Sequence, residues 1–404
     1  MMESQEAAQD RLQPLAYQRE VVAFLKRTEP ELWHWASSAQ AQTEYADGVR
    51  TQLLKDTYRL DADAHRELAT SCAAVASLLG IDAPVTLYQT GGAEMNAMLW
   101  YLPGEAHVIF TGPVLSVLRG AELRALLGHE LAHYRLWRND GGEIHIADRL
   151  LGAAASDPRA AASHVQTARR FRLYTEIYAD RGSLVACGDL EPAVAALVKT
   201  QTGLTEVSAA AYLRQADEIF ARFKGKTEGI DHPETFVRAR ALRLWHEGSA
   251  ELDRWLADMI EGRCAVDELD VLGQARFATL TRRFIAALLR PHWFFTDATG
   301  AHARQFFADF SPAASLDESL IDELKGVDAA TREYLCYLLL DFAAVDPDLE
   351  ELPLAAALDW SRRLGFEEEF EKLALKELGL GKRQLGRLKK DGAALLAKAE
   401  ARHG

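Results

Sequence analysis

The sequence predicts a mainly α-helical protein with one small β-sheet, an α+β fold. Stretches rich in Ala, Leu, Glu and Arg with a helical period make up most of the 404 residues. Strand-like alternation of β-branched and polar residues is confined to one region, 83–112. From about residue 311 the composition becomes acidic and wholly helical, which predicts a separate all-α domain at 311–404.

The first part of the chain is predicted to be helical. Two amphipathic helices are expected within 14–56, and the segment 1–60 that contains them is predicted to pack on the domain that follows. A third helix is expected from Ala62 to Leu79, where Gly80 ends it. We expect this central domain to span 61–250 and a helical linker to span 251–310.

The strand region and the long helices follow in order. "APVTLYQT" reads as a short strand, and "AEMNAMLWYLPGEAHVIFTG" as two strands joined by the turn "LPGE". A helix containing "ELRALLGHELAHYRLW" then runs to about Arg138 and ends at the glycines of "NDGGE". A second long helix is expected from about Ser163 to Val185. After the polar break "KGKTEGIDHPE", Pro233 occupies the first position of a further helix.

Charge and cysteine usage exclude several classes of protein. The formal net charge of −14 argues against nucleic acid or an anionic membrane as the main partner. The four cysteines are far apart and form no CxxC pair, which suits a reducing compartment. The N-terminus lacks the apolar run of a signal peptide, and no segment reaches about 18 uninterrupted apolar residues. We therefore expect a soluble, cytoplasmic protein with no membrane span.

The motif His129-Glu130-x-x-His133 carries the chemistry of the sequence. On a helix the two histidines lie one turn apart, about 6 Å along the axis, and point to the same side. Two imidazoles at this spacing can bind one Zn²⁺, which lowers the pKa of a bound water to about 7. Glu130 is placed to take a proton from that water and to pass it to a leaving amine.

The alternative is an amphipathic helix that carries two surface or partly buried histidines by chance. The flanking residues argue against this alternative, because apolar Leu126, Leu127, Leu131 and Ala132 surround the motif. Titratable side chains in such surroundings need a partner or a metal.

A zinc site of this kind needs a third protein ligand. The arrangement HExxHxxGxxH is excluded, because Leu136 and Asn139 stand at its last two defined positions. Another class of zinc peptidase takes a glutamate from a downstream helix, and "TEIYAD" supplies Glu176 for this role. Asp180, one turn later, would accept the second ring N–H of a ligand histidine and fix its tautomer. Taken by itself, the ExxxD pattern is also typical of a solvated helix face.

Five motifs in this part of the chain carry a resemblance to a known family. In order they are "EMNAM", "GPVLSVL", "ELRALLGHELAH", "EIYAD" and "DHPETFVRAR", within roughly residues 60 to 250. This region resembles the M48 family of zinc metallopeptidases, gluzincins that include bacterial heat-shock membrane proteases and the CAAX-prenyl endoprotease. The resemblance implies a zincin-like fold, zinc bound by His129, His133 and Glu176, and Glu130 as the catalytic base.

The resemblance also assigns roles to residues outside the zinc motif. His232 and Arg238 match the HPxxxxR motif of the family, which implies that His232 donates to an oxyanion and that Arg238 pairs with a site carboxylate such as Glu176. The alternative for this pair is a helix cap and a surface arginine. Asn96 and Ala97 match the edge strand on which family members hold an extended peptide. The alternative for these two residues is an ordinary strand of the sheet.

The sequence departs from many family members because it has no predicted transmembrane helix, which puts a membrane-protein substrate in doubt. The segment between His133 and Glu176 is too polar to span a bilayer. His145 and His164 lie in that segment, and we expect them at its surface rather than on the metal.

The C-terminal domain is similar to the helical TerB-like domain linked with tellurite resistance and stress response. "DFAAVDPDLEELPLAAALDWSRRLGF" carries this similarity. One interpretation of this domain, 311–404, is that it binds a protein partner, whereas its acidic residues by themselves are typical of a helix N-terminus.

The whole sequence is interpreted as a soluble, zinc-dependent endopeptidase that acts on peptides or proteins. One alternative is a catalytically silent zinc-binding adaptor or stress-response scaffold that recruits partners through the C-terminal domain. Another is a chance motif in a purely helical scaffold protein.

Overall fold

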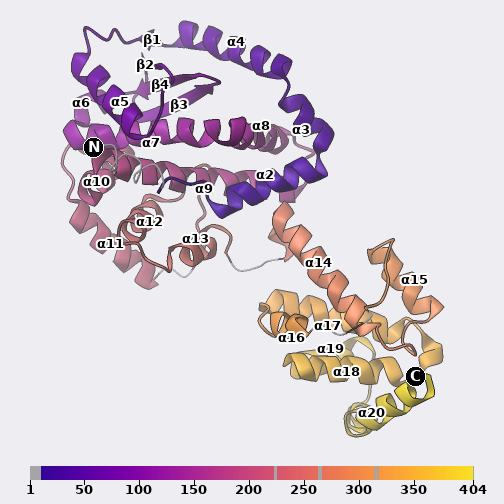
Figure 1. The fold of residues 1–404 in the computed structure, drawn as a ribbon. Coiled ribbons are helices and arrows are strands. Elements are labelled where there is room, and N and C mark those ends of the chain that lie inside the picture. Colours follow the sequence, from indigo (N-terminus) through magenta and orange to yellow (C-terminus); the bar gives the residue numbers. More distant parts are fainter. Residues whose placement is uncertain (1–10, 223–224, 263–265, 314, 316–317, 404) are drawn as a thin grey trace. The chain divides into compact units, whose positions relative to one another are not determined.

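A computed structural model describes residues 11–222, 225–262, 266–313, 315 and 318–403 (Figure 1). The chain divides into two compact units, Met1–Gly262 and Arg263–Gly404. Residues 1–10 of the predicted N-terminal helical segment, and Cys264, lie outside the described residues. The predicted fold class, mainly α with a small sheet, is confirmed.

The first unit contains a four-stranded mixed sheet. Its strands are β1 (Tyr58–Arg59), β2 (Val85–Thr90), β3 (Asn96–Leu102) and β4 (Glu105–Thr111), in the spatial order β1-β2-β4-β3. β2 runs parallel to β4, whereas β1 and β3 pair antiparallel with their neighbours. The hairpin predicted at "LPGE" joins β3 to β4. β3 is an edge strand, so only one side of its main chain pairs with another strand of the sheet.

Helices cover both faces of this sheet. On one face α4 packs Leu53 against Tyr88 and Ile109, and on the other face lie α5 and α7 (Figure 1). α9 packs along α7 on the side away from the sheet. The helices of this unit are α2 (Ala16–Thr28), α3 (Pro30–Ala36), α4 (Ala39–Asp56), α5 (Arg66–Leu78), α6 (Val114–Val117), α7 (Gly120–Arg138), the 3₁₀ turn η1 (Asn139–Gly142), α8 (Glu143–Ser156), α9 (Ala162–Cys187), α10 (Leu190–Thr202), α11 (Ala209–Arg222), α12 (Thr235–His246) and α13 (Leu252–Ile260).

The expectation of two helices within 14–56 was wrong, because the segment forms three: α2, α3 and α4. Pro30 has no N–H to continue α2 and instead occupies the first position of α3. α2 packs on α9. Tyr17 stacks on Tyr174 with ring centroids 4.8 Å apart, and the buried Gln18 amide donates to Thr175 Oγ1 at 3.0 Å.

Two glycines allow α7 and α9 to pack backbone against backbone. A Cβ atom on Gly128 of α7 would lie 2.3 Å from the Cβ of Ala186, and one on Gly182 of α9 would lie 2.3 Å from the Cβ of Ala132. Real Cβ contacts are never so short, so only glycine permits this helix separation. The two helices run antiparallel, since Gly128 meets Ala186, whereas Ala132, one turn later on α7, meets Gly182, one turn earlier on α9.

We expect Gly128→Ala to lower the free energy of unfolding of the first unit by about 1–3 kcal/mol, because the added methyl group must push α7 and α9 apart. Urea unfolding followed by circular dichroism measures the loss. Gly152→Ala in α8 is the matched control: a Cβ there meets nothing within 4 Å, so it should be neutral or stabilise by up to about 1 kcal/mol. Equal stability of the two variants would contradict the tight crossing.

The second unit is all-α in its described residues. Its core includes Phe284 and Leu288 of α14, Phe294, Leu339 and Phe342. Thus α14 and α15, which fall in the range 251–310 predicted as a linker, belong to this compact unit. The domain boundaries and the TerB-like similarity remain predictions. The helical elements of this unit are η2 (Val266–Glu268), α14 (Val271–Leu288), α15 (Asp297–Phe306), α16 (Glu318–Lys325), α17 (Ala329–Ala344), η3 (Pro347–Leu349), α18 (Leu352–Leu364), α19 (Glu367–Glu377) and α20 (Lys382–His403).

Candidate metal centre

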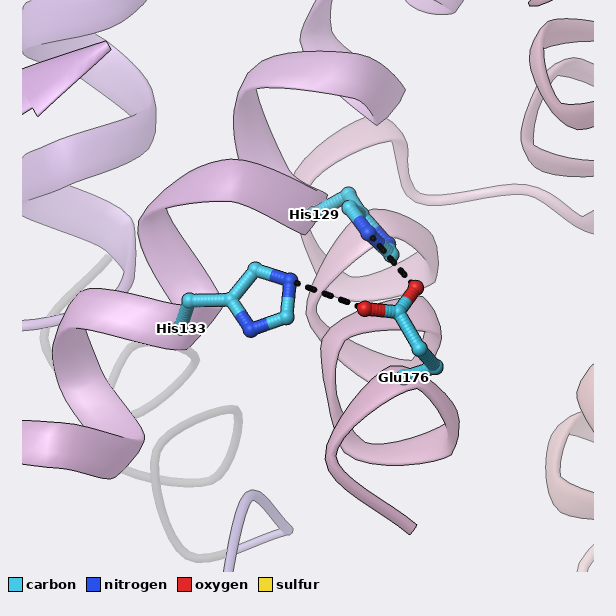
Figure 2. A group of neighbouring side chains, drawn as sticks. All are labelled: His129, His133 and Glu176. Atoms are coloured by element: carbon cyan, nitrogen blue, oxygen red, sulfur yellow. Dashed lines mark ion pairs between the residues drawn. The ribbon is translucent and has the colours of Figure 1, made fainter. Parts of the chain in front are cut away.

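His129, His133 and Glu176 point toward one another between α7 and α9 (Figure 2). His129 Nε2 lies 3.4 Å from Glu176 Oε2, and His133 Nε2 lies 3.6 Å from Glu176 Oε1. One ligand atom from each residue lies within 4.8 Å of the other two. The helix crossing at Gly128 and Gly182 brings the three side chains together, because it sets the distance between the two helix axes.

These three residues fit a zinc ion. Tetrahedral Zn²⁺ with bonds of about 2.0–2.1 Å holds neighbouring ligand atoms about 3.4 Å apart, close to the two separations between the histidine nitrogens and the glutamate oxygens. Glu176 Oε2 is buried and accepts no hydrogen bond from the described residues. Arg238 Nη2 lies 3.4 Å from this oxygen, and a metal ion would supply a second and closer positive charge. His129, His133 and Glu176 therefore lie close enough to hold a metal.

Asp180 and Arg238 hold the first histidine in place. Asp180 Oδ1 lies 3.1 Å from His129 Nδ1, which leaves Nε2 of that ring to face Glu176. Arg238 of α12 donates two hydrogen bonds to Asp180, from Nε at 2.8 Å and from Nη2 at 2.6 Å. Arg238 Nη2 also lies 3.4 Å from Glu176 Oε2. Arg238 is therefore a buried arginine whose main partner is Asp180, and Glu176 is its second.

Electrostatics in the metal-free site follow from burial and from these ion pairs. Burial disfavours the charged form of His129, but Asp180 and Glu176 outweigh it and raise its pKa to about 10. Burial lowers the pKa of His133 to about 4, so this imidazole is neutral and free to bind a metal at neutral pH. Burial also opposes ionisation of Glu176, yet His129 and Arg238 hold its pKa well below the ordinary value.

Glu130 lies next to this group and faces the same cleft. Its side chain is buried, and the main chain of Leu99 in β3 forms a hydrogen bond to its carboxylate. Burial raises the pKa of Glu130 to about 7. A carboxylate with a pKa near neutrality can both accept and return a proton under physiological conditions.

The cleft has a volume of about 770 Å³ and brings the remaining predicted residues beside His129, His133 and Glu176. Asn96 and Ala97 of the edge strand β3 line it, and the Ala97 N–H donates to Asn96 Oδ1 at 2.9 Å. His232 lies in the segment that leads into α12, with its side chain 56% exposed and its Nε2 3.6 Å from Glu176 Oε2. An exposed imidazole in this position can contact a bound peptide.

Among the residues that line the cleft and that sequence reasoning missed are Trp137, Asp148 and Arg172. Trp137 lies one turn after His133, and its ring centroid is 5.3 Å from that of His133. Arg172 lies one turn before Glu176. The spacing of four residues along each helix was the signal that could have found these two.

The expectation that His145 lies at the surface was wrong. Its side chain is buried, and its ring packs on Tyr101 at 4.4 Å and on Trp137 at 5.9 Å between centroids. Burial lowers the pKa of His145 to about 3, so it is neutral and serves as part of an aromatic cluster behind His133. His164 is half-buried and is not part of the metal group.

The mixed sheet with an edge strand, the HExxH helix and the glutamate of the next long helix together define a metallopeptidase. Residues 63–246, a little less than half of the chain, match Peptidase family M48. The match includes every predicted site residue, from Asn96 to Arg238, and lies wholly within the first unit. No curated protein and no solved structure matches the chain. Among the described residues, no helix is long and apolar enough to cross a membrane.

Proposed function

We propose that the chain is a zinc-dependent endopeptidase with one Zn²⁺ bound by His129, His133 and Glu176. The convergence of these three residues beside Glu130, in a cleft bordered by the edge strand β3, carries the proposal. Zinc bound there would polarise a peptide carbonyl and make hydroxide available near pH 7. The match of residues 63–246 to the M48 family supports peptide or protein as the substrate.

The chain's own residues would perform the remaining steps. The substrate would lie along the β3 edge near Asn96 and Ala97 and bond to the main chain. Glu130 would take a proton from the attacking water and give it to the leaving amine. The exposed ring of His232 would donate to the oxyanion of the tetrahedral intermediate. Arg238 would keep Asp180 in position and, through it, the ring of His129.

We further propose that the protein works in the cytoplasm and does not use nucleic acid as its substrate. Cys72, Cys187 and Cys336 are free thiols, which suits a reducing compartment. The net charge of −14 disfavours nucleic acid. A protein partner at the second unit is part of this proposal.

Metal removal tests the proposal. Purified protein should contain about one zinc per chain, and a chelator should abolish cleavage of an unfolded substrate such as casein. Zinc should restore it. Loss of an ion present at 1,000 times its Kd removes about 4 kcal/mol, so the melting temperature of the first unit should fall by about 10 °C.

The competing functions give different results in this experiment. If the protein binds stoichiometric zinc and is stabilised by it, but mass spectrometry detects no new termini in the substrate, the result would favour the silent adaptor. A protein that binds no stoichiometric zinc would contradict both the peptidase and the adaptor, and would leave the scaffold alternative.

A further inference from the structure

The cleft continues past the metal ligands along a regular register of α7 and α9. His129 lies opposite Asp180 and His133 lies opposite Glu176, so each turn forward on α7 is one turn back on α9. One more turn on each helix reaches Trp137 and Arg172, both of which line the cleft. This end of the cleft is therefore directly adjacent to the second metal ligand.

A charged group of three side chains lies at this end. Asp148 comes from α8, Arg172 from α9, and Asp231 from the segment before His232. Arg172 Nη1 bonds to Asp231 Oδ1 at 2.7 Å, so these two charges compensate each other. Arg172 acts on Asp148 only through space. In the described part of the chain, no group donates a hydrogen bond to Asp148 or forms an ion pair with it, so the group keeps a net charge of minus one.

The other acidic residues that line the cleft among the described residues are already engaged. Asp180 is held by Arg238, and Asp231 by Arg172. Glu234 accepts hydrogen bonds from the Thr227 hydroxyl and from the Glu228 N–H. Glu176 and Glu130 have the roles described above. Asp148 is the acid that remains without a partner.

Asp148 is also partly buried, so keeping its carboxylate ionised without a partner costs free energy. Burial raises its pKa to about 6, with Arg172 opposing the shift. The carboxylate is thus still mainly ionised at pH 7. A partly buried ionised carboxylate is stabilised by any cation that can reach it.

We propose that this end of the cleft is a subsite for a basic side chain, lysine or arginine, of the peptide substrate, and that Asp148 is the residue that pairs with its cation. The proposal rests on the proposed function, because it assigns specificity to the same cleft. The ring of Trp137 offers a surface for the aliphatic stem of the basic side chain. The acidic charge of the whole chain, −14, would attract basic peptides from a distance.

Cleavage of matched peptides tests the subsite. Two series of otherwise identical peptides carry a single lysine, or a single norleucine as its uncharged counterpart, at each position in turn. Cleavage of every peptide by the zinc-loaded full chain is then measured. At one position near the scissile bond, kcat/KM should be about tenfold higher for lysine than for norleucine. Asp148→Asn should abolish that ratio, and Asp148→Arg should favour glutamate there. Asp157→Asn, at the exposed end of the same helix and bound to Arg159, should keep the ratio.

A binding measurement separates failure of the subsite from failure of the peptidase proposal. Isothermal calorimetry measures the affinity of the same peptides for the zinc-loaded Glu130→Gln variant. The measurement is repeated on the variant that also carries Asp148→Asn. Tighter binding of a lysine peptide that depends on Asp148 supports the subsite even if the native chain cleaves nothing. Cleavage without any lysine preference, or a preference that survives Asp148→Asn, overturns the subsite while the peptidase stands.

Discussion

Replacing Glu130 with glutamine is expected to lower peptide cleavage by about 10²- to 10⁴-fold while zinc stays bound at one per chain. The reason is that glutamine keeps the shape of the side chain but cannot accept the proton of the attacking water. His129, His133 and Glu176 are unchanged, so the metal group should remain intact. The measurement is kcat/KM on a peptide substrate together with the zinc content of the same sample.

The fold should survive this substitution. Burial raises the pKa of Glu130 to about 7, so its ionised form is unfavourable in the metal-free protein and its removal should not lower the melting temperature. Glu67→Gln is the matched control, since Glu67 is exposed in the first turn of α5 and does not line the cleft. Full activity in Glu130→Gln would refute the role of this residue, whatever the zinc content.

The residues that could hold a metal were predicted because their spacing is local. His129 and His133 are four residues apart on one helix, and a helix alone places them on one face. Glu176 and Asp180 are likewise one turn apart, so each pair is visible in the sequence. The structure adds that the two pairs face each other in antiparallel register.

The helix contact that creates this register could not be read from the sequence. Gly128 looks like a residue that weakens a helix, because an isolated glycine costs about 1 kcal/mol relative to alanine. Its role in the close packing of α7 and α9 is seen only in the structure, where Gly182, 54 positions later, lies at the same crossing. Asp148 could not be predicted for a related reason. It lies in a segment whose polarity was its only recognisable feature, and tertiary packing places it at the cleft.

His145 lies in a different environment from the one that the composition of its segment predicts. The segment around it is polar enough to exclude a membrane span, and this suggested a surface position. In the structure α8 is amphipathic and buries Ile144, His145 and Ile146, so the histidine completes an aromatic cluster with Tyr101 and Trp137. Polarity of a segment therefore did not decide the burial of a single residue in it.

Arg238→Gln is expected to destabilise the first unit by about 3–5 kcal/mol and to weaken zinc binding by about 10- to 100-fold. The side chains of Arg238 and Asp180 are 11% and 4% exposed, so the substitution leaves a buried carboxylate without its two strongest hydrogen bonds. Asp180 would then no longer fix the ring of His129. Urea unfolding and competition with a zinc chelator measure the two effects. Arg238→Lys should retain only part of the stability and part of the zinc affinity, since lysine cannot form the paired hydrogen bonds of arginine.

Two comparisons show whether the loss comes from the unpaired charge. Arg243→Gln, which breaks the exposed pair with Asp217, should cost at most about 1 kcal/mol and leave zinc affinity unchanged. The double variant Arg238→Gln/Asp180→Asn should be more stable than the sum of the two single losses predicts, because it removes both buried charges together. If the losses were simply additive, or if Arg238→Gln behaved like Arg243→Gln, Arg238 would not be the residue that holds Asp180 against the metal ligand.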